Sequence, residues 1–329
     1  MRKKWTAALL AAALTLTLAA CGGAAEEPGD DRLRIVASLF PYYDIARAIA
    51  GDRAEVTLLV SAGRESHSYE PTPMDIIRIG RADLFLYNGG VDETWAAEVL
   101  ESNEHGFAIS MLEQVELREE EHIEGMQAGH GHEHEGHGAH DDHDGDHNDH
   151  AHEIEYDEHI WTSPVNAMTI ARVTAEAMMQ TDPVNAGYYE DNLQSYLAEL
   201  AALDSELRAV AESGQRRLIV LGDRFPLLYF CREYGLDYRA AFSGCSTETE
   251  PSASTMAYLI DRVREEHIPC VYYLENSSGL VAEAIAEASS AEPCLIYSCQ
   301  TVSPADLQAG ETYLSLMRRN VEALRKGLN

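Results

Sequence analysis

The sequence predicts an α/β fold with two lobes, each built around a parallel β-sheet, and one long rigid helix that joins them. Short β-rich runs alternate with helical segments in the N-terminal part, and the same alternation restarts near residue 216. The two series are separated by a long stretch with helical periodicity. The chain has 329 residues, which is enough for two ordinary domains.

The N-terminal lobe is expected to span residues 33–165. Its first strand is followed by PYYDIARAIAG, which has helical spacing and ends at Gly51, and a further helix is expected at Thr94–Leu100. Because strands alternate with helices, the sheet should be parallel and Rossmann-like. The expected strands are Leu33–Leu39, Glu55–Val60, Ala82–Tyr87 and Phe107–Ser110.

Residues 166–215 are expected to form the helices that link the lobes. The first, VNAMTIARVTAEAMMQ, should end near Asp182 because a proline follows it. The second, Val184–Ser213, places Tyr and Leu residues at intervals of mostly three and four. Roughly 28 helical residues would span ~40 Å at 1.5 Å per residue, which suits a bridge between lobes.

The C-terminal lobe is expected to span residues 216–329 and to repeat the alternation of strands and helices. Its expected strands are Arg217–Leu221, Tyr238–Phe242, Cys270–Leu274 and Cys294–Ser298. Its expected helices are Pro226–Tyr234, Ser254–Glu266, Gly279–Ala288 and Thr312–Leu328. The second lobe should therefore also be built on a parallel sheet.

The N-terminus predicts export and lipid attachment. Residues 1–20 combine a short basic region with an apolar run that is too short to span a bilayer, as in a signal peptide. The segment LAAC, which ends at Cys21, resembles a bacterial lipobox, and a plain signal peptide followed by a chance cysteine is the alternative. Residues 21–32 lack apolar periodicity and should be a flexible tether. The mature chain would be extracytoplasmic and anchored by its lipid to the outer face of the bacterial cell membrane.

The charge of the chain limits its partners. The formal net charge is −32 at pH 7, with histidines counted as neutral. This charge argues against a nucleic-acid partner, because a phosphate backbone would be repelled. It suits an exported protein that meets cations.

Residues 130–152, HGHEHEGHGAHDDHDGDHNDHAH, contain nine histidines and seven acidic residues. They belong to a segment, residues 122–155, that is expected to be a disordered loop because large apolar residues are almost absent from the tract. Its spacing specifies no fixed geometry, so we expect weak, exchangeable metal sites; a solubilising loop is the alternative. The histidines are His130, His132, His134, His137, His140, His143, His147, His150 and His152.

Two histidines of the N-terminal lobe are candidate metal ligands. His67 lies in GRESHSYEPTP, after a strand, where α/β sheets bind their ligands. His159 lies in YDEHIWTSPVNA, just before a Ser-Pro helix start. A solvated loop histidine is the alternative for either residue taken alone. Asp157 and Glu158 are either hydrogen-bond acceptors behind the site or surface charge, and surface charge is favoured for Glu158.

Three strand ends of the C-terminal lobe offer further ligand types. Asp223 follows RLIVL and Gly222, Glu275 follows CVYYL, and Cys299 follows CLIYS. A cap for the next helix is the alternative role for Asp223. Together with the two histidines, these residues outline a site of N, O and S ligands in a cleft between the lobes. Such a ligand set suits Zn²⁺.

Several segments resemble the metal-binding lipoproteins of bacterial ABC transporters for zinc and manganese. The segments are HSYEPTP, HIWTSPVNA, TDPVNAGYYEDNLQSYLAELAALD and AGETYLSLMRRNVEALRKGL, in collinear order within residues 33–329. The resemblance implies two α/β lobes on a rigid helical backbone and a metal in the cleft. It also implies that the protein delivers Zn²⁺ to an ABC permease and catalyses nothing. A monomer is expected.

The resemblance assigns ligands residue by residue. His67 and His159 match the two lobe-one histidines of the family. The usual His or Glu after the first strand of lobe two is missing, because that strand ends in GDRFP, and Asp223 is the candidate there. Cys299 stands at a late-strand position that often holds Asp, and Glu275 matches an acidic residue near the cleft.

Alternatives remain for the metal and the role. Mn²⁺ is the closest rival to Zn²⁺, because the acidic residues of lobe two suit it. A surface adhesin and an exported zinc hydrolase are the rival classes, and the absence of HExxH and GxSxG motifs argues against the hydrolase. A disulfide between Cys245 and Cys299 would remove the thiolate of Cys299. The cysteines whose pairing the spacing leaves open are Cys231, Cys245, Cys270, Cys294 and Cys299.

Overall fold

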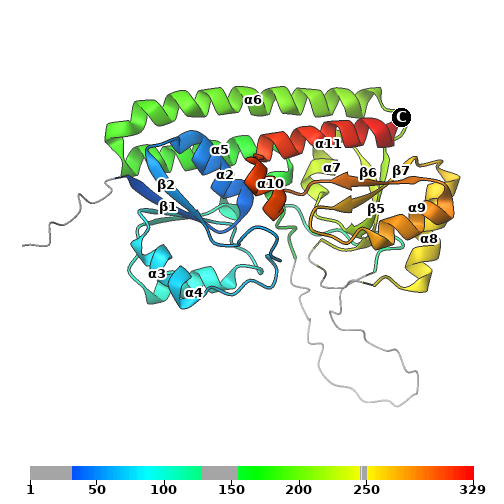
Figure 1. Cartoon of the computed structure of the whole chain (residues 1–329), viewed down its shortest axis with the longest axis horizontal. Helices are drawn as coiled ribbons and strands as arrows, with labels where there is room; N and C mark the ends of the chain where they lie inside the picture. The colour runs from blue at the N-terminus through cyan, green and yellow to red at the C-terminus, as the bar shows by residue number, and fades with distance from the viewer. Residues whose placement is uncertain (1–31, 128–154, 245, 247–249) are drawn as a thin grey trace, which may run out of the picture. The chain divides into compact units, whose positions relative to one another are not determined.

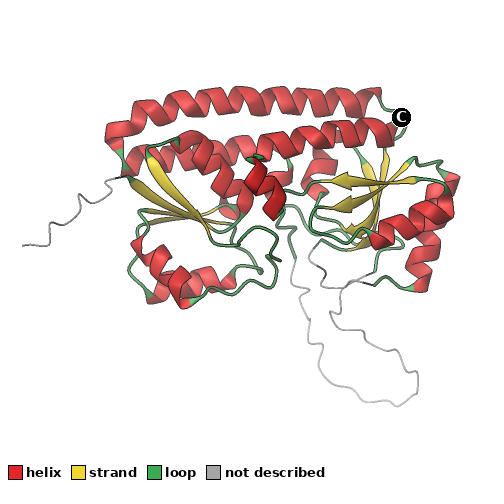
Figure 2. Cartoon of the chain, viewed as in Figure 1, coloured by secondary structure: helices red, strands yellow, loops and turns green. Residues whose placement is uncertain are grey.

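Two four-stranded sheets, all of whose strand pairs are parallel, form the centres of the two lobes (Figure 2). The computed structural model describes residues 32–127, 155–244, 246 and 250–329. The strands of lobe one are β1 (Leu33–Ala37), β2 (Ala54–Leu58), β3 (Leu84–Tyr87) and β4 (Phe107–Ser110). Those of lobe two are β5 (Leu218–Arg224), β6 (Asp237–Phe242), β7 (Cys270–Leu274) and β8 (Glu292–Ile296). The predicted pair of parallel α/β lobes is confirmed.

The two sheets share one topology. The strand orders are β2-β1-β3-β4 and β6-β5-β7-β8, so the first strand of each lobe lies between the second and the third. In each sheet, the connection after the first strand and the connection after the second strand therefore run in opposite directions across the sheet. In open α/β sheets such a switch in direction creates a crevice at the carboxyl ends of the strands, where ligands bind. The topology thus places the expected site at these strand ends in both lobes.

Helices connect the strands, and several begin at side-chain caps. In lobe one they are α2 (Phe40–Ala50), α3 (Pro73–Arg81) and α4 (Thr94–Ser102). In lobe two they are α7 (Leu228–Tyr234), α8 (Ala253–Glu265), α9 (Leu280–Ser289) and α10 (Pro304–Ala309). Thr72 and Asp75 form a reciprocal capping box at α3. Helix α10 was not predicted, because six residues are too few to show periodicity, although Ser303 and Pro304 are a start signal.

A layer of three helices joins the lobes. They are α5 (Pro164–Thr181), α6 (Ala186–Ser213) and α11 (Tyr313–Leu328). Helix α6 has 28 residues, as predicted, and α5, α11 and α2 all pack against it (Figure 1). Its buried side runs from Tyr189 to Ala211 and belongs to a core cluster that includes residues of both lobes. Because this core is continuous, the lobes share one packed backbone.

The C-terminal part of the chain returns to lobe one. The backbone N–H of Tyr313 donates to Asp44 Oδ2 at 2.8 Å, and its hydroxyl donates to the Trp161 carbonyl at 2.6 Å. The N–H of Gly63 donates to the Val302 carbonyl at 2.8 Å. Burial raises the pKa of Asp44. The hydrogen bond from the Tyr313 N–H and the charge of Arg47 act in the opposite direction, and the net pKa is about 6. These contacts reinforce the connection made by α6.

Candidate metal centre

A polar cavity of about 150 Å³ lies where the strand-end loops of the two lobes meet. Lobe one contributes the loop after β2. Lobe two contributes the carboxyl end of β5 and the loops after β7 and β8. The lining residues that bear on metal binding are His67, Asp223, Arg224, Glu275 and Gln300. The cavity therefore occupies the position that the shared sheet topology favours.

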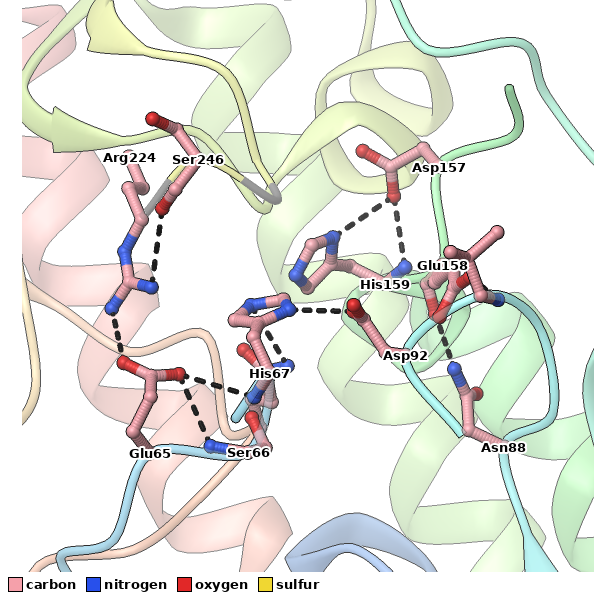
Figure 3. Close-up of polar contacts among 12 residues, drawn as sticks. Glu65, Ser66, His67, Asn88, Asp92, Asp157, Glu158, His159, Arg224 and Ser246 are labelled. Atoms are coloured by element: carbon pink, nitrogen blue, oxygen red, sulfur yellow. Dashed lines mark hydrogen bonds and ion pairs between the residues drawn. The ribbon is translucent and has the colours of Figure 1, made fainter. Parts of the chain in front are cut away.

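The ring of His67 lines this cavity, and the buried ring of His159 lies against the ring of His67. Their centroids are 5.6 Å apart with an angle of 62° between the ring planes (Figure 3). His67 comes from the loop between β2 and α3, and His159 directly precedes the short 3₁₀ turn Ile160–Thr162 that leads into α5. Two histidines that are 92 positions apart in sequence are thus brought together, as the sequence predicted.

The ring of His67 is fixed from both of its nitrogen atoms. Its Nδ1 lies 2.5 Å from Asp92 Oδ2, and its Nε2 lies 3.3 Å from the side-chain nitrogen of Gln300 in lobe two. The side chain of His67 is only 5% exposed. Burial raises the pKa of Asp92, but the hydrogen bond and the charge of His67 outweigh burial and hold it below the ordinary value. The Nε2 atom of His67 therefore faces lobe two while Asp92 orients the ring.

The ring of His159 is fully buried and fixed from one side. Asp157 Oδ1 accepts from the His159 backbone N–H at 2.8 Å and lies 3.2 Å from His159 Nδ1. The Nε2 atom of His159 is buried and has no hydrogen-bond partner among the described residues. Burial lowers the pKa of His159, but the charge and hydrogen bond of Asp157, with Asp92 and Glu158, give a net rise. A buried ring nitrogen without a hydrogen-bond partner is unusual, and it favours a role for His159 Nε2 as a ligand atom.

Glu158 is buried, so the expectation of a surface charge was wrong. It is 5% exposed, and its Oε1 accepts from the Val91 backbone N–H at 2.5 Å. A Cβ at Gly90, where φ is +78°, would lie 2.2 Å from the same oxygen, so glycine makes room for the carboxyl. Burial and the charge of Asp92 raise the pKa of Glu158 to about 8. Burial and the neighbouring carboxylate of Asp92 therefore favour the protonated form of Glu158.

The two acidic candidates of lobe two line the cavity, but both are committed to other donors. Asp223 Oδ1 accepts from the Arg224 N–H at 2.9 Å, and its Oδ2 accepts from the Leu274 N–H at 3.2 Å. Glu275 accepts from the N–H and hydroxyl of Ser298, both at 2.8 Å, and from the Cys299 N–H at 2.7 Å. Burial raises the pKa of Glu275 to about 7 despite these donors. The two carboxyl groups therefore hold the strand-end loops in place.

Cys299 does not reach the cavity. Its side chain is 0% exposed, belongs to the hydrophobic core, and is absent from the residues that line the cavity. Burial raises the pKa of its thiol well above the ordinary value, so it stays protonated. Cys245 lies outside the described residues, which leaves its pairing untested. The Sγ atoms of Cys270 and Cys294, on the paired strands β7 and β8, are 2.6 Å apart.

A cross-lobe ion pair lies beside the candidate ligands. Arg224 Nη2 donates to Glu65 Oε2 at 2.7 Å, and Glu65 Oε1 accepts from the N–H groups of Ser66 and His67 (Figure 3). Arg224 itself cannot bind a cation, but it ties the His67 loop to the end of β5. The pair therefore sets the position of His67 relative to lobe two.

Sequence reasoning missed Asp92, Gln300 and the Glu65–Arg224 pair. Asp92 follows a strand and two glycines whose φ values are +87° and +78°, so a strand-end acid after a Gly-Gly turn was a usable signal. Gln300 follows Cys299, whose own φ is +59°, and this turn directs the glutamine to His67. The Glu65–Arg224 pair joins residues 159 positions apart and had no sequence signal.

Other predicted features fall outside this site. Cys21, the signal segment and the nine histidines of residues 130–152 lie outside the described residues. In the part of the chain that is described, no helix is both long and apolar enough to cross a bilayer.

The fold and the cleft define a two-lobed binding protein whose paired imidazoles suit a transition-metal ion. The family model for "Zinc-uptake complex component A periplasmic" matches residues 35–327, so the chain belongs to this family. It is an extracytoplasmic receptor of zinc uptake, as the resemblance implied.

Known relatives agree with the family assignment. The chain is 32% identical to the high-affinity zinc uptake system protein ZnuA of Bacillus subtilis (strain 168) over 339 residues, which covers 100% of this chain and 99% of that protein. It is 29% identical to the zinc-binding lipoprotein AdcA of Streptococcus pneumoniae serotype 4, covering 97% of this chain but 60% of AdcA. The solved Zn(II)-bound ZnuA-like domain of S. pneumoniae AdcA is 25% identical, with a TM-score of 0.71 over 90% of this chain and 99% of that domain.

Proposed function

We propose that the chain captures one Zn²⁺ ion in its interlobe cleft and delivers it to an ABC permease. The observation that carries this proposal is the pair His67 and His159, whose rings are in contact and whose Nδ1 atoms each lie beside a carboxylate. In this arrangement the two Nε2 atoms are the lone-pair donors. That of His159 has no hydrogen-bond partner among the described residues, and that of His67 would exchange its contact with the Gln300 amide for the metal. Zinc is the cargo of the protein, so reversible binding is the whole of its chemistry.

The carboxylates behind the rings support metal binding in two ways. A metal-bound imidazole typically donates its other ring N–H to a carboxylate, which fixes the tautomer and raises the basicity of the ligand atom. Asp92 is the carboxylate beside Nδ1 of His67, and Asp157 is the carboxylate beside Nδ1 of His159. The buried Nε2 of His159 has no partner among the described residues, and a cation would remove this unfavourable burial.

We propose an asymmetric ligand set. The two imidazoles of lobe one are the nitrogen ligands, and oxygen atoms of Asp223, of the Gln300 amide or of water fill the remaining positions. Glu275 acts as a support for the loop after β8, and the buried thiol of Cys299 takes no part. Two nitrogen donors favour Zn²⁺ over Mn²⁺, because Mn²⁺ is the weaker binder at such ligands in the order of divalent metals.

The remaining features fit a surface receptor without catalysis. Attachment of the mature chain through a lipid on Cys21 would keep it near the permease. The histidines of residues 130–152 would hold further Zn²⁺ weakly and raise its local concentration. A monomer suffices, because both histidines and the cavity come from one chain.

Calorimetric titration tests this proposal in a tract-silenced chain, defined as the full-length chain with the nine histidines of residues 130–152 replaced by asparagine. We expect a tight Zn²⁺ equivalent that Mn²⁺ displaces poorly and that disappears in H67A/H159A. The matched control H105N/H267N changes two histidines outside the cleft and should keep it. Retention of the tight equivalent in H67A/H159A would contradict the proposal, and preferential binding of Mn²⁺ would establish the rival metal.

A further inference from the structure

A second group of metal-ligand types lies outside the cleft. Glu120, His122 and Glu155, here called the loop-base cluster, place their ligand atoms within 4.8 Å of one another. Within residues 32–127, 155–244, 246 and 250–329, no other group of three His, Cys, Asp or Glu residues does so. In sequence, the cluster flanks the histidine tract: Glu120 and His122 precede it, and Glu155 follows it.

Backbone pairing holds the two sides of the loop-base cluster together. The Glu120 N–H donates to the Glu155 carbonyl at 2.9 Å, and the Asp157 N–H donates to the Arg118 carbonyl at 2.9 Å. Glu119 and Tyr156 form an antiparallel bridge between the same two segments. Two paired segments fix the Cα positions of Glu120 and Glu155, so their approach does not depend on flexible side chains alone.

One carboxyl oxygen of the partly buried Glu120 side chain lies without a hydrogen-bond partner among the described residues. This atom, Oε1, is itself buried. Burial, with the charges of Asp157 and Glu155, raises the pKa of Glu120 above its ordinary value. Leaving a carboxyl oxygen buried without a partner is unfavourable, and a bound cation would satisfy it.

We propose that Glu120, His122 and Glu155 form a second, exchangeable site for a divalent cation of the Zn²⁺ class. Imidazole nitrogen and carboxylate oxygen both bind zinc, and a set of three protein ligands leaves a coordination position for water. His122 and Glu155 are exposed, so an ion can enter and leave from solvent. The site shares no residue with the cleft ligands, so it stands independently of them.

The loop-base cluster also adjoins the support of the cleft. Glu120 and Asp157 line one small pocket together with Gly244, and Asp157 is the residue that orients His159. A cation at the cluster would reduce the repulsion between Glu120 and Asp157. The second site therefore lies close to Asp157, the residue that orients His159, and Glu155 follows the histidine tract closely in sequence.

Calorimetry on the tract-silenced chain tests this proposal. We expect two Zn²⁺ equivalents, one tight and one at least tenfold weaker. E120Q/H122N should remove only the weaker equivalent, whereas the matched control E104Q/H105N, an exposed Glu-His pair elsewhere, should retain both. H67A/H159A should remove only the tight equivalent, which separates failure of the cleft assignment from failure of this one.

Anomalous diffraction at the zinc edge gives a second measurement that does not depend on stoichiometry. We expect a zinc peak between Glu120, His122 and Glu155 in crystals of the full chain and its absence in E120Q/H122N. The proposal is overturned if the tract-silenced chain binds a single equivalent, or if E120Q/H122N keeps both equivalents with unchanged affinity.

Discussion

The two walls of the cleft differ in what their polar side chains do. On the lobe-one side, Asp92 and Asp157 orient the imidazoles, and the Nε2 atom of His159 has no partner among the described residues. On the lobe-two side, Asp223 and Glu275 accept hydrogen bonds from backbone N–H groups of their own lobe. In the proposed site, lobe one therefore supplies the nitrogen ligands, and lobe two mainly provides a polar wall. Acidic residues at equivalent strand ends do not have equivalent roles.

The largest expected effect distinguishes the two walls directly. H159A or H67A should each weaken Zn²⁺ binding more than 100-fold, because each removes a nitrogen ligand, whereas D223A should weaken it less than tenfold. Dissociation constants measured by competition with a chelator decide the comparison. If D223A matches the loss in H159A, lobe two supplies an essential ligand and the asymmetry is wrong.

The next effect concerns the carboxylates behind the rings. D157N and D92N should each reduce Zn²⁺ affinity by roughly 10–100-fold, because the amide no longer stabilises the ring N–H as a carboxylate does. Glu275→Gln, on the opposite wall, is the matched change and should leave affinity within about threefold. Equal losses in all three variants would mean that the walls act alike.

The pH dependence of binding should follow the raised pKa values of lobe one. The pKa of His159 is raised above its ordinary 6.5, and that of Glu158 is raised to about 8. Protons compete with the metal for His159, and the ionised form of Glu158 adds negative charge near the bound cation. Affinity should therefore be highest above pH 8 and fall as the pH drops from 8 to 6. Titrations across this range give the slope, and E158Q should flatten its upper part. An affinity that is constant from pH 8 to 6 would contradict this assignment.

The pH dependence of the stability of the metal-free protein should report on Glu275 in the lobe-two wall. Burial raises the pKa of Glu275 to about 7, above its unfolded value near 4.5. A group raised on folding contributes stability that is complete below about pH 4.5 and is lost as the pH rises through about 7. Melting temperatures should therefore fall between pH 5 and 8, by an equivalent of roughly 1–3 kcal/mol for this group. E275Q should reduce this fall, and an unchanged profile would mean that Glu275 is not the source.

The smallest effect is expected for the ion pair that joins the walls. Glu65 and Arg224 are partly exposed, so R224Q should cost at most about 1 kcal/mol of stability. It should still increase the rate of Zn²⁺ release severalfold, because the His67 loop loses its tie to β5. Stopped-flow release with R318Q, which removes a surface pair away from the cleft, provides the control. Equal release rates in both variants would show that the tie has no role.

The sequence by itself predicted the α/β class, the 28-residue helix and the proximity of His67 and His159. These features rest on periodicities within one segment, or on rare residue types at strand ends, which a single sequence displays. Glu158 shows where this reasoning stops. An acid beside a candidate ligand has the same sequence pattern whether it is solvated or buried, and only the packing of Gly90 and Val91 against it decided the outcome.

Tertiary structure alone decided which strand-end residues face the cleft. Asp92 is 25 positions from His67, and Gln300 is 233 positions away, so neither contact follows from local pattern. The direction of Cys299 depends on a left-handed backbone turn that aims its thiol into the core and its neighbour into the cavity. Side-chain direction at a strand end depends on one or two backbone dihedrals and on the opposing lobe, and residue type does not encode either.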